Sequence, residues 1–344
     1  MRIGRSESVG VMLVAAGLAA AVGLRATRTR RVSSFNGKSV VITGGSRGLG
    51  LVLARQLAAD RARITLIARD ESELRRAADD IHDREPSADV LIVPADVRER
   101  EDVGRAVAQT IGRHGRIDVL INNAGIIQVG PIHHMKLSDY DDAMNTHFWG
   151  PLFMMLAVLP HMRYEGGGRI VNISSIGGRI AVPHLVPYSA SKFALTGLSD
   201  GLRAELAREN IVVTTVCPGL MRIGSAMNAT FKGQRAQEYS WFAISSSLPV
   251  TTISAERAAR QILDACRRGE AELVITVQAK LAVRARSIAP ELFADAMAFI
   301  NRLLPRATGP DGDVAQPGRA TGSEWAQSTV LAPMYAAAQK NNEL

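Results

Sequence analysis

Short apolar runs alternate with longer amphipathic stretches from residue 38 onward. The runs are rich in β-branched residues and almost continuously hydrophobic, which is typical of parallel strands buried on both faces. They are "SVVIT" (39–43), "RITLIA" (63–68), "VLIVPA" (90–95), "IDVLIN" (117–122), "GRIVNIS" (168–174), "IVVTTVC" (211–217) and "ELVIT" (272–276). Helical patterns between them include residues 49–60, 71–84, 99–113 and 255–268. The alternation predicts an α/β fold with a doubly wound sheet of seven parallel strands.

An apolar run without a charged residue precedes this pattern. Residues 9–24, "VGVMLVAAGLAAAVGL", are shorter than a usual membrane span of about twenty residues, and "RATRTRR" follows them. A cleaved signal peptide, a poorly ordered leader and a membrane anchor are the competing interpretations. The basic flank stands where a signal peptide has small residues, and it favours a cytoplasmic location for everything after residue 25. We therefore expect residues 1–31 to anchor the protein on the cytoplasmic face of a membrane, the alternative being a cytoplasmic protein.

Two further segments follow the alternating pattern. Residues 281–305 are amphipathic and basic on one face, so they could lie on a membrane surface or pack as an ordinary surface helix. Residues 306–344 are rich in Gly, Pro, Thr and Asp before a final stretch with helical character. The sequence predicts a flexible tail there, with room for one short docking helix. A single catalytic domain over residues 36–280 remains.

Composition excludes several classes of protein. The chain has 344 residues, 47% of them hydrophobic, which suits one large α/β domain. Of the formal net charge of +8, residues 1–31 contribute +5, and no long basic run contains interleaved aromatic residues, so a nucleic-acid surface is not expected. Cys217 and Cys266 are too few for a disulfide framework and are expected to be buried free thiols. The four histidines near the expected cleft lack the spacing of metal ligands and are interpreted as lining residues: His133, His134, His147 and His184.

A glycine cluster, "TGGSRGLG" (43–50), follows the first strand and opens the first helix. Glycines at such a place let the backbone turn tightly and approach a phosphate, which then lies against the helix N-terminus. A tight turn without a ligand is the alternative. The position after a strand and before a helix favours a dinucleotide site.

The tip of the second strand distinguishes between two cofactors. NAD sites usually place an acidic residue there to bind the ribose 2′-hydroxyl. Here Ala68 and Arg69 stand at the tip, and Arg47 lies inside the glycine cluster. Two guanidinium groups suit a 2′-phosphate, whereas Asp70, one residue further on, argues the other way. The balance favours NADP(H) over NAD(H).

Polar residues end the third and fourth strands. Asp96 in "ADV" (95–97) could accept a hydrogen bond from an adenine amine, and Asn122 in "NNAG" (122–125) could brace the sheet through its amide. Both stretches could instead be ordinary turns, because Asn, Asp and Gly favour turns.

The stretch "VPYSASKFAL" (186–195) places Tyr188 one helical turn before Lys192. Ser175 ends the fifth strand, at the edge where open parallel sheets bind ligands. A neighbouring ammonium group would lower the pKa of the phenol, so that the tyrosine could exchange a proton with a carbonyl or alcohol oxygen held by Ser175. A chance Tyr/Lys pair on an exposed helix is the alternative.

In order and spacing, these motifs together with Asn145 in "MNTHFWG" (144–150) and "CPG" (217–219) resemble the short-chain dehydrogenase/reductase family. The match spans about residues 36–280, and the TGxxxGxG and YxxxK patterns place it in the branch with a core of about 250 residues. The resemblance implies a Rossmann-like sheet with strand order 3-2-1-4-5-6-7. It also implies a homodimer or homotetramer through the long helices near 139–163 and 187–209.

The resemblance assigns Ser175, Tyr188 and Lys192 as catalytic, with Asn145 holding a water that links Lys192 to solvent. It assigns no metal. The cofactor-binding positions that it implies are Gly44, Ser46, Arg47, Gly48, Leu49, Gly50, Arg69, Asp96, Val97, Asn123, Ala124, Gly125, Tyr188, Lys192, Pro218, Gly219 and Ile223.

Two features test this assignment. The length suits the family's extended branch, which includes sugar-nucleotide epimerases, but that branch carries TGxxGxxG and the surplus length here lies outside the core. Ile223 replaces the usual threonine that helps to hold the nicotinamide carboxamide. Its backbone N–H could still serve, so we expect weaker anchoring of the carboxamide, by about 0.5–1.5 kcal/mol for one hydrogen bond.

The substrate should be set by residues 220–250, where Met227, Phe231, Tyr239, Trp241 and Phe242 are either a lid over an apolar ligand or core packing. We expect an NADP(H)-dependent oxidoreductase acting on a lipophilic carbonyl compound or alcohol. The alternative is a cofactor-binding regulatory or scaffold protein without turnover. All four catalytic positions are filled, which argues against that alternative.

Overall fold

The structure, a computed structural model, describes residues 34–248, 252–322 and 329–344. The apolar run at 9–24, and with it the predicted membrane anchor, lies outside these residues. Among the residues described, every helix is too short or too polar to cross a bilayer.

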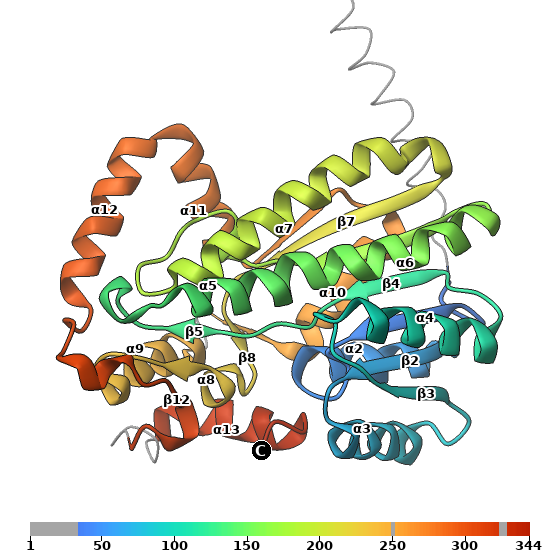
Figure 1. Cartoon of the computed structure of the whole chain (residues 1–344), viewed down its shortest axis with the longest axis horizontal. Coiled ribbons are helices and arrows are strands. Elements are labelled where there is room, and N and C mark those ends of the chain that lie inside the picture. The colour runs from blue at the N-terminus through green and yellow to red at the C-terminus, as the bar shows by residue number, and fades with distance from the viewer. Residues whose placement is uncertain (1–33, 249–251, 323–328) are drawn as a thin grey trace, which may run out of the picture.

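Within the described residues, seven parallel strands form the central sheet in the order β11-β7-β6-β4-β1-β2-β3 (Figure 1). They are β1 (Ser39–Thr43), β2 (Arg63–Ala68), β3 (Asp89–Pro94), β4 (Val119–Asn122), β6 (Gly168–Ile173), β7 (Ile211–Pro218) and β11 (Glu272–Ile275). The number, direction and order of the strands confirm the predicted doubly wound Rossmann-like sheet. The carboxyl ends of β1 and β4, between which the chain order reverses, therefore meet at one edge.

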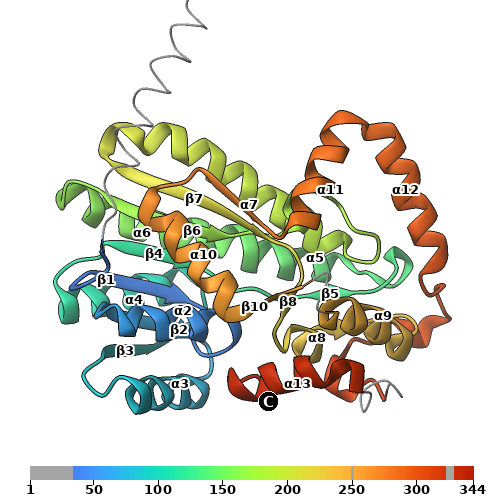
Figure 2. The same ribbon diagram turned by 180° about the vertical axis from the view of Figure 1, so that it is seen from behind.

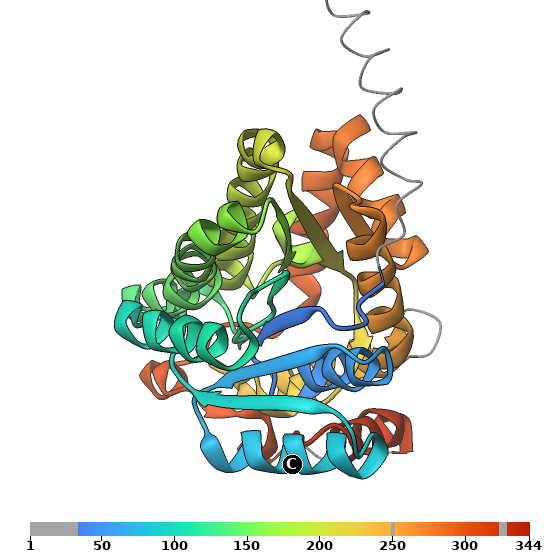
Figure 3. The same cartoon turned by 90° about the vertical axis from the view of Figure 1, so that its right-hand side faces the viewer.

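Helices cover both faces of the sheet (Figure 3). One face carries α2 (Gly48–Ala59), α3 (Glu71–Arg84) and α10 (Ala255–Arg268), and the other carries α4 (Arg100–His114), α6 (Gly150–Tyr164) and α7 (Val186–Glu205). Alternate side chains of β1 point to opposite faces, so Val40 and Ile42 join one hydrophobic cluster and Val41 joins the other.

Local signals in the sequence define where these helices begin and end. The Asp70 side chain caps α3 by accepting a hydrogen bond from the Glu73 N–H at 3.0 Å. Gly115, with φ of 76°, ends α4 in the left-handed conformation that glycine tolerates. The boundaries of α3 and α10 coincide with the predicted 71–84 and 255–268.

A smaller lobe lies beyond the carboxyl edge of the sheet (Figure 1). Its elements are β5 (Gln128–Val129), η1 (Ile132–His134), β8 (Met221–Arg222), α8 (Ser225–Asn228), β9 (Thr230–Phe231), α9 (Arg235–Ser247), β10 (Ile253–Ser254), η5 (Pro310–Asp313), β12 (Gln316–Pro317), η6 (Gly318–Ala320), η8 (Thr329–Leu331) and α13 (Ala332–Lys340). Its core contains Phe231, Tyr239, Phe242 and Met334. Three of the aromatic residues predicted as lid or core are thus buried in a core of their own.

The C-terminal region differs from the sequence prediction. Residues 281–305 fall in two helices, α11 (Val277–Ile288) and α12 (Pro290–Leu303). The break between them is at Ala289, because proline disfavours helical geometry at the residue that precedes it. The described part of 306–344 belongs to the smaller lobe and also contacts the sheet domain (Figure 2), whereas the sequence predicts a flexible tail. The predicted docking helix corresponds to α13, which buries Met334 and Ala338. Cys217 and Cys266 are buried free thiols, as predicted, and burial raises their pKa to about 12 and about 11.

Candidate active site

A cleft of about 1180 Å³ opens at the carboxyl edge of the sheet, between the sheet domain and the smaller lobe. Its lining combines the glycine cluster, the ends of β4 and β6, the start of α7 and part of α9. All the predicted site residues line it except Gly50 and Asn145. The cleft is therefore built where an open parallel sheet binds ligands.

The glycine cluster forms a tight turn between β1 and α2. Gly44 has φ of 63°, and a Cβ on it would stand 2.8 Å from the Cα of Ala124. A Cβ on Gly50 would collide with the Gly44 carbonyl oxygen, so a glycine at this position lets α2 begin directly against the turn. Gly50 itself does not line the cleft. The Asn123 amide donates to the carbonyl oxygens of Thr43 and Gly44 at 3.1 and 3.0 Å. A narrow cradle that only glycine fits suits a pyrophosphate group.

The charged residues near this turn are paired with one another. Arg47 lies 3.0 Å from Glu73, and the Ser46 hydroxyl donates to the same carboxylate at 2.9 Å. The Asp70 carboxylate is engaged in capping α3, and hydrogen bonds from Ser72 and from the Glu73 backbone lower its pKa. Glu73 is an acidic neighbour of the predicted phosphate site that the sequence analysis missed.

Asp96 and Asn122 have definite partners. The Asp96 carboxylate accepts a hydrogen bond from the Arg98 guanidinium at 2.7 Å. Burial alone would raise the pKa of Asp96, but this pairing holds that pKa below its ordinary value. The Asn122 amide donates to the Asn172 side chain at 2.8 Å and so braces β4 against β6, as predicted. Val97, Ala124 and Gly125 line the cleft.

Ser175, Tyr188 and Lys192 come together at the inner end of the cleft. Ser175 follows β6 and caps η3 (Ile176–Gly178), accepting from the Gly177 N–H at 3.0 Å. Tyr188 and Lys192 lie in the first two turns of α7, and the Lys192 Nζ is 5.7 Å from the centroid of the Tyr188 ring. Lys192 is buried and donates to the Ile173 carbonyl oxygen at 2.9 Å.

The electrostatics of this group differ from the expectation. Burial raises the pKa of Tyr188 above its ordinary value, and a hydrogen bond with Ser175 offsets this in part. Burial lowers the pKa of Lys192 to about 7. Burial therefore decides the direction of the shift, and the amine, which lies over the ring, does not lower the pKa of the phenol as predicted.

Asn145 does not reach this group, which corrects the prediction. It is exposed and begins η2 (Asn145–Trp149), a π-helical turn that joins α5 (Leu137–Met144) to α6. His147, on the same turn, is buried and lines the cleft. Its Nε2 accepts from the Ile126 N–H at 3.1 Å, and its Nδ1 lies 2.8 Å from the Ser191 hydroxyl.

His147 is the residue that η2 brings to the active site. Its ring meets that of Tyr188 edge-on, and burial, with the Lys192 charge, holds the pKa of His147 well below its ordinary value. The sequence predicts only a lining residue at this position, which His147 also is. The other three histidines, predicted to line the cleft, do not: His133 is exposed, His134 pairs with Asp313 and His184 pairs with Glu238. Among the described residues, no group of potential metal ligands is found.

The last predicted segment follows β7. Pro218, Gly219 and Ile223 line the cleft, but the Ile223 N–H, expected to be available to a carboxamide, donates to the Met221 carbonyl oxygen at 3.1 Å. Glu343, close to the end of the chain, also lines the cleft. No local pattern in the sequence could have placed it there.

Comparisons with known proteins agree with this geometry. The sequence profile of the short chain dehydrogenase family matches residues 38–235. The chain is 33% identical over 269 residues to the dehydrogenase/reductase SDR family protein 7-like of Anopheles gambiae, covering 77% of this chain and 83% of that protein. It is 35% identical over 258 residues to the 11-beta-hydroxysteroid dehydrogenase-like 4A of Arabidopsis thaliana, covering 75% of this chain and 82% of that protein.

Among solved structures, L-sorbose reductase from Gluconobacter frateurii, in complex with NADPH and L-sorbose, has a similar fold. The TM-score is 0.63 with 26% sequence identity, over 70% of this chain and 96% of that one. The profile match, the relatives and the fold lead to one conclusion. The chain belongs to the short-chain dehydrogenase/reductase family, oxidoreductases whose fold binds a nicotinamide cofactor.

Proposed function

We propose that this protein is an NADP(H)-dependent oxidoreductase that interconverts a lipophilic carbonyl compound and the corresponding secondary alcohol. The observation that supports this most directly is the convergence of Ser175, Tyr188 and Lys192 in one cleft with the glycine turn. The nicotinamide, when bound, exchanges hydride with the substrate carbon. The side chains of the protein have to hold the substrate oxygen and move its proton.

Tyr188 is the proposed acid in the reducing direction. Because burial raises its pKa, the phenol is protonated at neutral pH and can donate its proton to a carbonyl oxygen. Ser175, which shares a hydrogen bond with Tyr188, holds the same oxygen. Lys192, with its pKa lowered to about 7, can gain or lose a proton near neutral pH and so can resupply the phenol.

The residues around the glycine turn fit NADP(H). Arg47, Ser46 and Arg69 all line the cleft, and guanidinium groups bind phosphate oxygens in a bidentate manner. Asp70, the residue that argued for NAD(H), is engaged as the cap of α3. A 2′-phosphate would have to replace Glu73 as the partner of Arg47 and Ser46. The NADPH complex of the sorbose reductase supports the same choice by analogy.

The substrate end of the cleft supports an apolar ligand. Its lining contains the apolar side chains Ile127, Val182, Leu185, Leu220, Trp241 and Phe242. Trp241 is half-buried on α9, where it packs against the core of the smaller lobe and also lines the cleft. The Arabidopsis relative's name points to steroids, a lipophilic class, for that protein.

Membrane association and self-association extend this proposal. Within the described part of the chain, α12 buries none of its residues, and Leu292, Phe299 and Leu303 on it are exposed, as a helix lying on a membrane surface requires.

Trp149, Leu156 and Tyr164 are exposed along η2 and α6, where the proposed homodimer or homotetramer would form. Flotation with anionic vesicles and light scattering at several concentrations test the two points separately.

The function is tested by following NADPH absorbance with steroid, retinoid and long-chain ketones, using ketoses as a polar control. Wild-type protein should turn over at least one apolar class. Tyr188→Phe should lose about 10²–10⁴-fold in kcat while still binding NADPH. Equal rates for the two proteins would instead indicate a cofactor-binding protein without turnover, and preference for ketoses would contradict the lipophilic substrate.

A further inference from the structure

The C-terminal end of the chain lies against the glycine turn. After α13, the terminal segment (residues 341–344) runs beside α2 and α3 (Figure 2). Asn342 has φ of 58°, a left-handed conformation that asparagine tolerates, and it turns the chain toward the cleft. Met334 and Ala338 pack α13 into the core of the smaller lobe, so the segment begins from a fixed helix.

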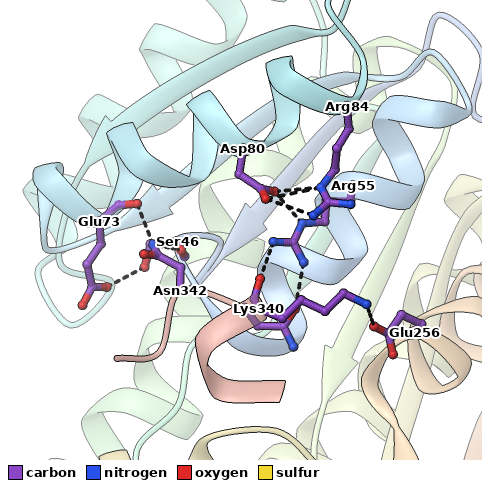
Figure 4. Close-up of polar contacts among 9 residues, drawn as sticks. Ser46, Arg55, Glu73, Asp80, Arg84, Glu256, Lys340 and Asn342 are labelled. Atoms are coloured by element: carbon purple, nitrogen blue, oxygen red, sulfur yellow. Dashed lines mark hydrogen bonds and ion pairs between the residues drawn. The ribbon is translucent and has the colours of Figure 1, made fainter. Parts of the chain in front are cut away.

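Contacts with α2 and α10 hold the base of this segment (Figure 4). Arg55, paired with Asp80, donates to the Lys340 carbonyl oxygen at 2.7 Å and to the Asn341 side chain at 2.8 Å. The Lys340 ammonium lies 2.5 Å from Glu256. The path of the segment is thus defined by several polar contacts and not by one.

The segment then forms hydrogen bonds with the glycine turn itself. The Gly48 N–H, at the start of α2, donates to the Asn341 carbonyl oxygen at 2.9 Å. The Asn342 amide donates to the carbonyl oxygens of Ser46 and Glu73 at 2.9 and 3.1 Å (Figure 4). The contacts with Gly48 and Ser46 lie on the turn that receives the cofactor's phosphates in the proposed function.

Glu343 places a carboxylate between this turn and the loop after β7. Its Oε2 accepts from the Gly224 N–H at 2.7 Å, and a Cβ on Gly48 would stand 3.1 Å from its Oε1. The side chain is 7% exposed and lines the cleft. The carboxyl group therefore accepts one backbone N–H and stands against Gly48, the first residue of α2, where the phosphates of a dinucleotide would lie.

We propose that residues 341–343 compete with the dinucleotide for the glycine turn, so that the terminal segment must undock before the cofactor can bind. The inference rests on the proposed function, because it takes the turn as the cofactor site. Burial raises the pKa of Glu343 to about 7, while the hydrogen bond from the Gly224 N–H and the charge of Arg47 offset this in part.

The test compares NADP⁺ binding by the full chain and by a chain that ends at Lys340. The truncation leaves α13 and its buried residues in place, and the unfolding temperature checks that the fold is intact. Leu344→Ala, a change at an exposed position in the same segment, is the matched control. We expect the truncated chain to bind NADP⁺ about tenfold tighter or more, because a larger fraction of molecules then has a glycine turn free of the terminal segment. The control should bind like wild type.

Hydrogen exchange gives a second readout that needs no turnover. Addition of NADP⁺ to the full chain should increase exchange in peptides that cover residues 332–344 and decrease it around residues 43–50. Unchanged or weaker binding by the truncated chain, or protection of the terminal segment by NADP⁺, overturns the competition while leaving the proposed function intact. Absence of dinucleotide binding by both chains overturns the proposed function together with the inference.

Discussion

The ring of His147 stands edge-on to the ring of Tyr188, with the two centroids 5.4 Å apart and the planes at 87°. Ser191 donates its hydroxyl proton to the Tyr188 carbonyl oxygen, so its oxygen accepts from the His147 Nδ1–H. The Ile126 N–H donates a hydrogen bond to the other ring nitrogen, Nε2. His147 is therefore a neutral ring that ties the loop after β4 to the start of α7, and both of its nitrogens are engaged.

We predict that His147 positions Tyr188 and does not itself move protons. His147→Phe keeps a ring but loses both hydrogen bonds, and an unsatisfied buried donor costs about 1–3 kcal/mol, so kcat should fall about tenfold or more. His147→Gln, which keeps an acceptor, should restore part of this rate. The pH profile of kcat should be the same in all three proteins. Loss of an acidic limb from the profile in His147→Gln would mean that His147 titrates during the reaction.

Cofactor choice should depend on the pairing of Arg47 with Glu73. Arg47→Ala should weaken NADP⁺ binding about tenfold or more and leave NAD⁺ binding almost unchanged, because a charge-assisted hydrogen bond contributes about 1.5–3 kcal/mol. Glu73→Gln should strengthen NADP⁺ binding, since it frees Arg47 and removes a like charge. Titrations of both dinucleotides measure this. Glu71→Gln, an exposed acid on the same helix that pairs with Arg75, is the control, and an equal effect of Arg47→Ala on both cofactors would contradict the proposed phosphate site.

Stability should depend on pH through Lys192. The pKa of its amine is about 7 in the folded protein, whereas an unfolded chain has an ordinary lysine pKa of about 10.4. Between these values the unfolded state binds more protons, so the free energy of unfolding should rise with pH over this range. Thermal melts of the cofactor-free protein from about pH 7 to about pH 9 measure this against Lys192→Met, which should show a smaller slope. Parallel slopes would show that the lysine is ordinarily solvated.

Competition by the terminal segment should also depend on pH. The pKa of Glu343 is raised to about 7 when the segment is docked and returns to its ordinary value when it is released. Docking is then strongest below the ordinary value and weakens as the pH rises toward about 7. The charged groups around the segment are Arg47 on the glycine turn, Arg55 and Asp80 beside Asn341, Glu73 and Arg76 beside Asn342, and Glu256 beside Lys340.

The wild-type chain should therefore bind NADP⁺ more tightly, relative to the chain that ends at Lys340, as the pH rises through this window. Glu343→Gln stays neutral and keeps an acceptor for the Gly224 N–H, so its relative affinity should stay low and constant. Glu291→Gln, which removes an exposed acid on α12, should behave like wild type. If the ratio of the NADP⁺ affinities of the wild-type chain and of the chain that ends at Lys340 does not change with pH, Glu343 is not buried when the segment competes.

Much of the site could be predicted because its residues are local to strand ends and helix starts. Ser175, Tyr188 and Lys192 need only β6, a short turn and one helical turn to meet, and the glycine cluster needs only a strand and a helix. Asn145 was assigned by its resemblance to a family motif, which gives a position in the chain but not which side chain of that turn points inward. The hydrogen bond from the Gly150 N–H to the Asn145 carbonyl oxygen closes a wider π-turn, and His147 lies inward.

By itself the sequence determined the alternation of strands and helices, the glycine turn and the spacing of the catalytic group, whereas the order of the strands followed only from the family resemblance. The alternation, the turn and the spacing depend on local backbone preferences and on which face of each element is apolar. Tertiary structure alone decided that Glu343 reaches Gly224, that Glu73 pairs with Arg47, and that desolvation governs the pKa values of Tyr188 and Lys192. Such contacts join residues far apart in the chain, and burial is a property of the packed molecule, so no pattern of neighbouring residues records them.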